Sequence, residues 1–231
     1  MNEHIVMQPF TSDWFLWNSV TLFFIALIIL VSLKSKPSFK TKLPFLMGIV
    51  IALEFFLIQY YYIDQGIWTL QDSLPFHLCR LMWFLSLFAI LTRNQIAFEL
   101  LLFVGMIGGI HSMFTPEFTH GINQLLMVDF FLVHGGLILI PLYCVLVLGM
   151  RPRKNAWYKS IIYLQIFVVV VALIDYFLGA NYMYLAIKPA VDNPFLIGDW
   201  PYYIIGLELA TLLHAFLVYL PFYYKNHFLE V

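Results

Sequence analysis

The sequence is short of charged residues and of cysteines, and each shortage excludes a class of protein. Only 11% of the 231 residues are Asp, Glu, Lys or Arg, whereas soluble domains carry about 25%. The net charge of -1 gives no basic surface, so no nucleic-acid partner is expected. The two cysteines, Cys79 and Cys144, are too few for a disulfide framework. Because 62% of the residues are hydrophobic, the composition predicts an integral membrane protein.

Several motifs of known chemistry are also missing from the sequence. The last hydrophobic stretch has no lysine that could form a retinal Schiff base. The sequence has no Cys-x-x-Cys-His motif, which would predict haem, and no His-Glu-x-x-His motif, which would predict zinc. A Gly-x-Ser-x-Gly elbow and a nucleotide-binding loop are absent too. We therefore expect neither a metal ion nor a cofactor.

Long apolar stretches are what the sequence does contain. A membrane-spanning helix needs about 20 mostly apolar residues. Seven stretches qualify, namely Trp14–Leu33, Phe45–Ile63, Leu74–Leu91, Gln95–Phe114, Leu125–Leu148, Trp157–Leu178 and Tyr203–Tyr223. Their connections are short and leave no room for a second domain. The prediction is an all-α fold, in which residues 1–231 form a single compact bundle of seven transmembrane helices.

The basic residues indicate how this bundle is oriented. Cytoplasmic loops carry an excess of Lys and Arg. The connections after the first, third and fifth stretches hold Lys34, Lys36, Lys40, Lys42, Arg93, Arg151, Arg153 and Lys154. The connections on the other side hold only Lys188. We predict a multi-pass protein of the cell membrane, with its N-terminus outside and its C-terminus in the cytoplasm.

Two other features concern packing and the outer surface. The segment from Asn181 to Pro201 is rich in Tyr, Trp and Pro, which suits either a lid over the bundle or an interfacial cap. Gly105, Gly109 and the pair Gly135-Gly136 predict close contacts between helices, because small residues let backbones approach.

Ionisable residues inside the apolar stretches are the main functional signal. Each charge at bilayer depth costs about 2.5–3.5 kcal/mol, so these residues should face inward and pair. A rise of about 1.5 Å per residue places most of them in the outer half of the bundle, with Glu99 on the inner side and Glu54 near the middle. The set is Glu54, His77, Arg80, Glu99, His111, Asp129, His134, Asp175, Glu208 and His214.

The third stretch contains the densest group, His77, Cys79 and Arg80. Ser73 is the expected N-cap and Pro75 lies in the expected first turn, which would put Cys79 beyond that turn. His77 and Cys79 would lie about 200° apart around the helix and could not form a dyad. If Cys79 is a nucleophile, its base must come from another helix.

The best candidates for that base are His134 and His111. Arg80 is expected either to pair with Glu208, Asp175 or Asp129 or to hold a lipid phosphate. His120 and His4 are expected to be simply exposed.

Four segments carry a resemblance to known proteins. They are Leu-Pro-Phe-His-Leu-Cys at 74–79, His134-Gly135, the run from Asn181-Tyr-Met-Tyr-Leu to Lys-Pro189, and Gly-Asp-Trp-Pro-Tyr-Tyr at 198–203. Together they resemble the YwaF-type family of bacterial membrane proteins over nearly the whole chain. That family is similar to the eukaryotic transmembrane protein 164 family.

This resemblance implies an acyltransferase that acts on membrane phospholipids, with a cysteine in the third span and a histidine in the fifth. Carried over, these are Cys79 and His134. The eukaryotic motif sets Cys directly beside His, whereas Leu78 separates them here, so His77 is a second candidate for the catalytic position.

Two hypotheses follow for the function. The first is a phospholipid acyltransferase or lipid ester hydrolase with Cys79 as nucleophile and His134 as base. Its substrate-binding residues would be Arg80, His111, Asn181, Lys188, Glu208 and Asp175. The second is a non-catalytic transporter or lipid- or small-molecule-binding protein, whose buried charges are structural or relay protons.

Overall fold

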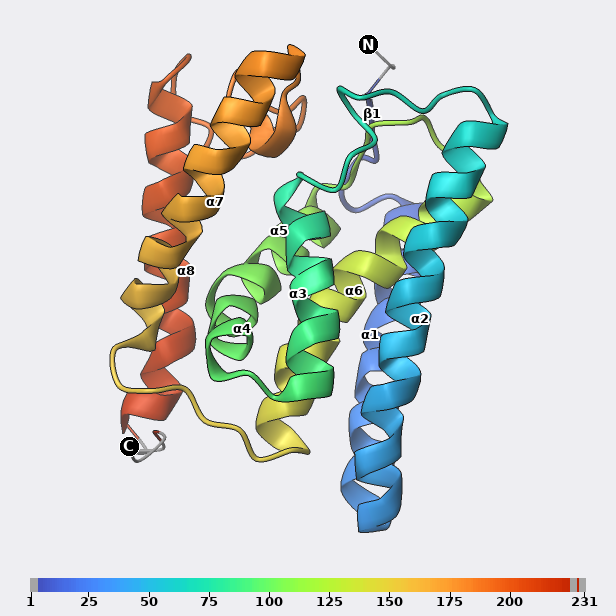
Figure 1. The fold of residues 1–231 in the computed structure, drawn as a ribbon, viewed down its shortest axis with the longest axis vertical. Helices are drawn as coiled ribbons and strands as arrows, with labels where there is room; N and C mark the ends of the chain where they lie inside the picture. Colours follow the sequence, from blue (N-terminus) through green and yellow to red (C-terminus); the bar gives the residue numbers. More distant parts are fainter. Residues whose placement is uncertain (1–3, 225–227, 229–231) are drawn as a thin grey trace.

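The computed structural model describes residues 4–224 and 228, and it is almost entirely helical (Figure 1). The helices are α1 (Ser12–Lys34), α2 (Pro37–Asp64), α3 (Leu78–Thr92), α4 (Gln95–Leu100), α5 (Met106–Phe114), α6 (Gln124–Leu146), α7 (Ala156–Leu178) and α8 (Tyr202–Tyr224). A π-helical turn, Leu101–Gly105, joins α4 to α5, and a 3-10 turn, Tyr182–Tyr184, follows α7. Two short strands, β1 (Ile5–Val6) and β2 (Glu117–Phe118), pair antiparallel.

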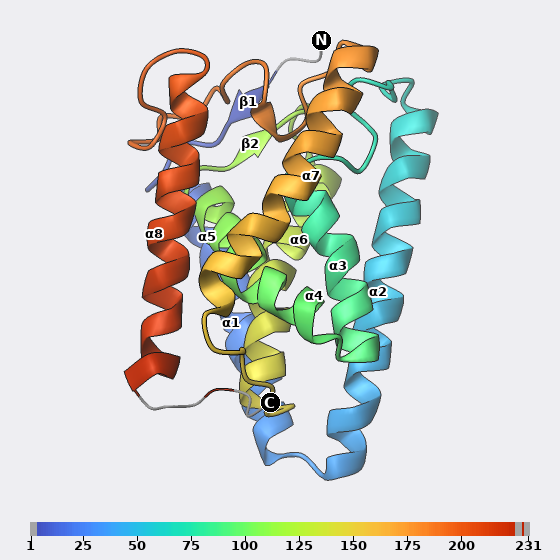
Figure 2. The ribbon, with the colours of Figure 1, turned by 60° about the vertical axis from the view of Figure 1, so that its left-hand side comes forward.

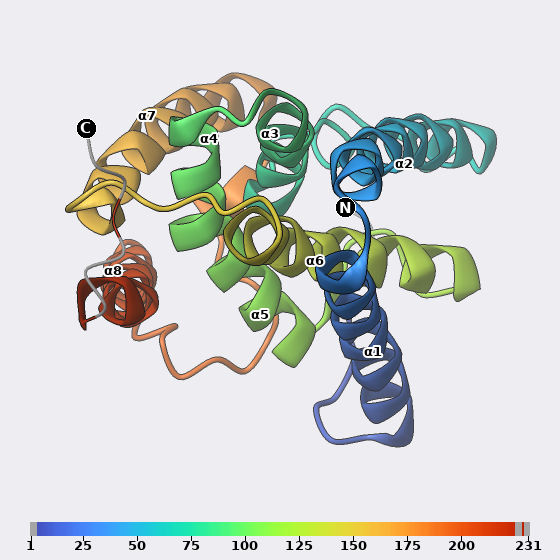
Figure 3. The same ribbon diagram turned by 90° about the horizontal axis from the view of Figure 1, so that it is seen from below.

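The helices form a central group with a pair on either side. Seen from below, α3, α4, α5 and α6 lie between α1 and α2 on one side and α7 and α8 on the other (Figure 3). The continuous element from α4 to α5 is the most buried of the long helices. The flanking helices expose many large apolar side chains, as a lipid-facing surface requires.

Most of the predicted spans are confirmed. Six helical elements within the described residues are long and apolar enough to cross a membrane, and one of them is Gln95–Phe114, as predicted. The main difference among these six is α2, which begins eight residues before the predicted stretch, at Pro37. Proline fits there because the first helical positions need no backbone N–H.

The predicted start of the third span is wrong. The helix begins at Leu78 with His77 as its N-cap, so Ser73 is not the cap and Pro75 is not in the first turn. Hydrogen bonds outside the helix hold the residues before Leu78 in a non-helical conformation. The Ser73 hydroxyl accepts a hydrogen bond from the backbone N–H of Thr69 at 3.0 Å, and the N–H of Leu74 donates to the Tyr182 hydroxyl at 2.9 Å. The resulting α3 has 15 residues.

The close packing predicted at the glycines is confirmed. A Cβ at Gly109 would lie 2.8 Å from the carbonyl oxygen of His134, so α5 and α6 touch there. A Cβ at Gly135 would overlap Thr21 of α1, and one at Gly136 would overlap the ring of Trp83 in α3. The glycines therefore let three helices approach α6 around His134.

An ion pair closes the end of the bundle where the basic residues gather. The Glu99 carboxylate is only 2% exposed. It accepts hydrogen bonds from the Arg153 guanidinium at 2.6 Å, from the Arg153 backbone N–H at 2.7 Å and from Gln95 at 2.8 Å. This confirms that buried charges pair, because an unpaired carboxylate at this site would lack solvation.

Gly136 gives a test of this packing. Gly136→Ala should lower the free energy of unfolding by about 1–3 kcal/mol, because the added methyl group forces the Trp83 ring to move. The measurement is chemical or thermal unfolding of the purified protein in mild detergent.

A matched control is Gly108→Ala, whose Cβ would meet only the Cys79 sulfur at 3.8 Å, an ordinary contact. Equal loss of stability in the two variants would contradict the role given to Gly136.

Candidate functional site

A cavity of about 370 Å³ lies at the end of the bundle that carries β1, β2 and the connection between α7 and α8. Figure 2 shows these three features at one end of the molecule. The cavity is lined by side chains of α2, α3, α5, α6 and α8 and by the loops that cover them. Among its lining residues are five of the predicted site residues: His77, Cys79, Arg80, His111 and His134. The other four predicted site residues, Asn181, Lys188, Glu208 and Asp175, lie elsewhere.

Cys79 occupies the second position of α3. The expectation that it lies beyond the first turn is wrong, because the helix starts four residues later than predicted. The first N–H groups of a helix have no partner within the helix and carry its positive dipole end. The Cys79 sulfur lies 3.7 Å from the Ser112 hydroxyl oxygen of α5. The thiol therefore lies at the N-terminal end of α3, where Cys79 lines the cavity.

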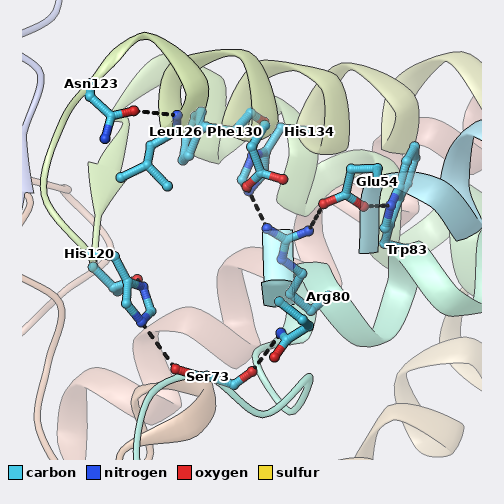
Figure 4. A network of polar contacts seen from close by, with 12 residues as sticks. Glu54, Ser73, Arg80, Trp83, His120, Asn123, Leu126, Phe130 and His134 are labelled. Carbon is cyan, nitrogen blue, oxygen red and sulfur yellow. Dashed lines mark hydrogen bonds and ion pairs between the residues drawn. The ribbon is translucent and has the colours of Figure 1, made fainter. Parts of the chain in front are cut away.

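His134 is presented by α6 with one ring nitrogen fixed. Its Nδ1 lies 2.7 Å from the carbonyl oxygen of Phe130, and its ring packs against the Phe130 ring (Figure 4). A carbonyl only accepts hydrogen bonds, so Nδ1 carries the proton in this contact. In the neutral ring Nε2 then has a free lone pair. His134 thus has the tautomer that a general base requires.

Arg80 joins three helices through an ionic cluster (Figure 4). Its Nη1 donates to Glu54 of α2 and its Nη2 to Asp129 of α6, each at 2.5 Å. Trp83 Nε1 donates to the second oxygen of Glu54 at 2.5 Å. Asp129 was one of the predicted partners, while Glu54 was not foreseen. Because both guanidinium ends are occupied, Arg80 is poorly placed to bind a phosphate.

The remaining predicted binding residues do not line this cavity. Glu208 accepts a hydrogen bond from Gln165 at 3.1 Å, between α8 and α7. Asp175 accepts from the backbone N–H of Tyr182 at 2.9 Å. Lys188 is exposed and lies 3.5 Å from Asp199. These contacts are between helices or within loops.

Asn181 is the fourth residue of this kind. Its side-chain oxygen accepts from the N–H groups of Ala186 and Ile187, and its amide donates to the Ile187 carbonyl, all within 3.0 Å. The side chain therefore closes a tight loop after α7. Asn181 holds backbone in place and has no free donor directed at the cavity.

Sequence reasoning missed two cavity residues, Ser112 and Tyr184, and it wrongly expected a third, His120, to be exposed. His120 is half-buried, stacks on Tyr62 at 4.1 Å and bonds the hydroxyls of Thr119 and Ser73. Burial lowers the pKa of His120, although the Asp72 charge acts the other way. Ser112 and Tyr184 were missed because a serine or tyrosine in such a stretch carries no signal of its own.

The loop that carries Tyr184 has an unusual backbone. Met183 and Tyr184 both have positive φ, at 54° and 56°. Such a conformation costs a residue other than glycine about 1–3 kcal/mol and persists only where the surroundings impose it. Tyr184, Pro189, Val191, Asn193 and Phe195 of this connection all line the cavity. Of the two readings left open for residues 181–201, the cover over the bundle matches this arrangement.

A second cavity of about 570 Å³ lies between α1, α5 and α8. It is mainly apolar, and His111 lines both cavities. His111 packs edge-on against His214 with ring centroids 4.8 Å apart, and Phe195 packs against both rings. These three side chains lie where the two cavities approach each other.

Comparison with known proteins gives the family. The model of the TMEM164 family matches residues 8–219. The chain belongs to the TMEM164 family. No curated protein and no solved structure matches it. The matched range contains all the cavity residues named above, and the resemblance expected from the sequence is confirmed. This TMEM164-family chain is a multi-pass membrane protein with apolar helices.

The ionic cluster generates a prediction about stability. Arg80→Met should lower the free energy of unfolding by about 3–5 kcal/mol, because Glu54 and Asp129 then remain buried without a counter-charge. Unfolding of this variant in detergent micelles or bicelles measures the effect.

The control is the triple variant Arg80→Met, Glu54→Gln, Asp129→Asn, which removes all three charges. It should regain most of the lost stability. A triple variant as unstable as Arg80→Met would show that the charges do not account for the effect.

Proposed function

We propose that this protein is a phospholipid acyltransferase of the cell membrane that forms an acyl thioester on Cys79. The observation that carries the proposal is that Cys79 of α3 and His134 of α6 line one cavity inside an apolar bundle. A thiol at the start of a helix and a histidine with a free Nε2 are the two groups that acyl transfer through cysteine needs. His111 and His77 also line this cavity, but only His134 has its Nδ1 fixed by a backbone carbonyl 2.7 Å away within the bundle centre.

The first half-reaction transfers the acyl group to the protein. His134 Nε2 takes the proton of the Cys79 thiol, and the thiolate attacks the ester carbonyl carbon of a phospholipid. A C–S bond forms and the carbonyl oxygen becomes an oxyanion. When the oxyanion collapses, the C–O bond breaks, and the imidazolium of His134 protonates the departing lysophospholipid oxygen. The products are a thioester on Cys79 and a neutral His134.

The second half-reaction releases the acyl group. His134 takes the proton from the hydroxyl of a second lysophospholipid, whose oxygen attacks the thioester carbon. Collapse of this second oxyanion breaks the C–S bond, and the Cys79 thiolate regains its proton from the imidazolium. Water in place of the lysophospholipid would give ester hydrolysis by the same steps.

The second cavity is a suitable place for the acyl chain of the substrate. It lies between α1, α5 and α8 and is lined mainly by apolar side chains, so hydrocarbon from the bilayer can occupy it. Because His111 borders both cavities, an acyl chain in the second cavity would place its ester near the first, which holds Cys79 and His134. The substrate would then remain in its leaflet throughout the reaction.

The nucleophile can be tested with a thiol-reactive lipid ester. Purified protein in nanodiscs should become acylated at Cys79 by a phosphatidylcholine with a labelled acyl chain, and Cys79→Ala should lose all of this label. Intact-protein and peptide mass spectrometry measure the acylated site.

Cys144→Ala is the matched control, because Cys144 is fully buried in α6 and does not line the cavity. It should label as the wild type does, whereas His134→Gln should slow labelling about 10²–10⁴-fold. Equal labelling of wild type and Cys79→Ala would overturn the proposal. Saturable lipid binding without acylation would favour the non-catalytic alternative.

The orientation gives a second test. We propose seven crossings with α3 included, with the cavity facing outward and the basic connections facing the cytoplasm. In intact cells, a cysteine placed at exposed Asp192 should react with a membrane-impermeant maleimide, and one placed at exposed Lys36 should react only after permeabilisation. The opposite labelling pattern would reverse the orientation.

A further inference from the structure

Among the residues by which the connection after α7 lines the cavity, Tyr184 carries a phenol hydroxyl. Tyr184 is the second of two successive residues with positive φ. Its ring lies 6.0 Å from that of His77, the N-cap of α3, measured between ring centroids. The phenol thus approaches the start of α3, where the Cys79 thiol is held.

The surrounding bonds fix this position from both directions. Before it in the chain, Tyr182 is fully buried, and its hydroxyl donates to the Leu70 carbonyl while accepting from the Leu74 N–H. At Tyr184 itself, the carbonyl accepts a hydrogen bond from the Tyr203 hydroxyl of α8 at 2.6 Å. After it, the Asn181 side chain closes the loop. These five hydrogen bonds therefore hold the strained backbone at Tyr184 in place.

The hydroxyl of Tyr184 is available to a ligand. It lies beside the Glu117 carboxylate and the residue lines the cavity, so a bound ester could take the place of Glu117 as its acceptor. Burial raises the pKa of Tyr184, and the nearby charges of Glu117 and Cys79 raise it further. The phenol therefore keeps its proton and remains a donor close to the thiol.

We propose that Tyr184 is a catalytic residue that donates a hydrogen bond to the ester carbonyl oxygen while Cys79 attacks the carbonyl carbon. This inference rests on the proposed acyl transfer and adds the group that stabilises its oxyanion. The backbone N–H of Cys79 lies in the first turn of α3, where N–H groups have no partner within the helix, and it supplies the second donor. No bond to Tyr184 forms or breaks in this step; the phenol keeps its proton while charge develops on the carbonyl oxygen.

Other polar side chains near the thiol are less suited to this role. Both ends of the Arg80 guanidinium are bonded to carboxylates. The Ser112 hydroxyl lies beside the sulfur itself at 3.7 Å. His134 is needed to move the proton. Tyr184 lines the same cavity as the thiol, and the Cys79 charge acts on its phenol.

The test compares two reactions of the same thiol in nanodiscs. Acylation of Cys79 by a labelled phosphatidylcholine passes through an oxyanion, whereas alkylation by iodoacetamide does not. Tyr184→Phe removes only the hydroxyl. It should slow acylation about 10²–10³-fold, the usual effect of losing one oxyanion donor, and leave the alkylation rate unchanged.

Tyr176→Phe is the control, since Tyr176 is 81% exposed on α7 and lines neither cavity. It should change neither rate. If wild type is acylated and Tyr184→Phe is acylated equally fast, the role of Tyr184 is overturned and the proposed function stands. If Tyr184→Phe slows both reactions equally, Tyr184 only supports the loop or the thiol. If wild-type Cys79 is not acylated at all, the proposed function falls and this inference falls with it.

Discussion

The bond between one arginine and two carboxylates determines how the centre of this protein is arranged. A guanidinium inside a bilayer has almost no water to solvate it, so Arg80 must find its partners within the bundle. Those partners are Glu54 of α2 and Asp129 of α6, and Trp83 donates a hydrogen bond to the second oxygen of Glu54. Since Arg80 follows Cys79 directly, the same bonds that join three helices fix where the thiol stands. Stability and candidate chemistry therefore depend on one cluster.

Much of the fold could be predicted from the sequence, and the exception has a physical cause. Apolar length alone located six long helices, because a bilayer demands helices of one length. The start of α3 was placed too early because Ser73 and Pro75 match the usual pattern of a helix start. In the structure, distant residues such as Tyr182 bond that segment instead. Local propensity could not reveal those long-range bonds, nor the π-helical turn between α4 and α5.

The sequence could predict how deep the candidate site residues lie along their helices, but not in which direction each side chain points. Counting residues along each span placed Cys79 and His111 at a similar depth and His134 about midway, and all three line the cavity. The partner Glu54 was missed because the rotation of α2 about its axis is set by packing that the sequence does not state. Asn181 and Asp175 were predicted to bind substrate, yet their hydrogen bonds hold the connection between α7 and α8. A polar residue in or beside a loop gives the same sequence signal whether its side chain binds a ligand or the backbone.

The late start of α3 fixes the distance between the thiol and bulk water. A helix of 15 residues is about 22 Å long, whereas the hydrocarbon core is about 30 Å thick. With Thr92 at the basic end of the bundle, the thiol would stand roughly 8 Å within the hydrocarbon layer. At that level the cavity around a thioester would hold few water molecules. In the proposed reaction, a lysophospholipid would thus compete well against water for the acyl group, and the length of one helix would decide the partition between transfer and hydrolysis.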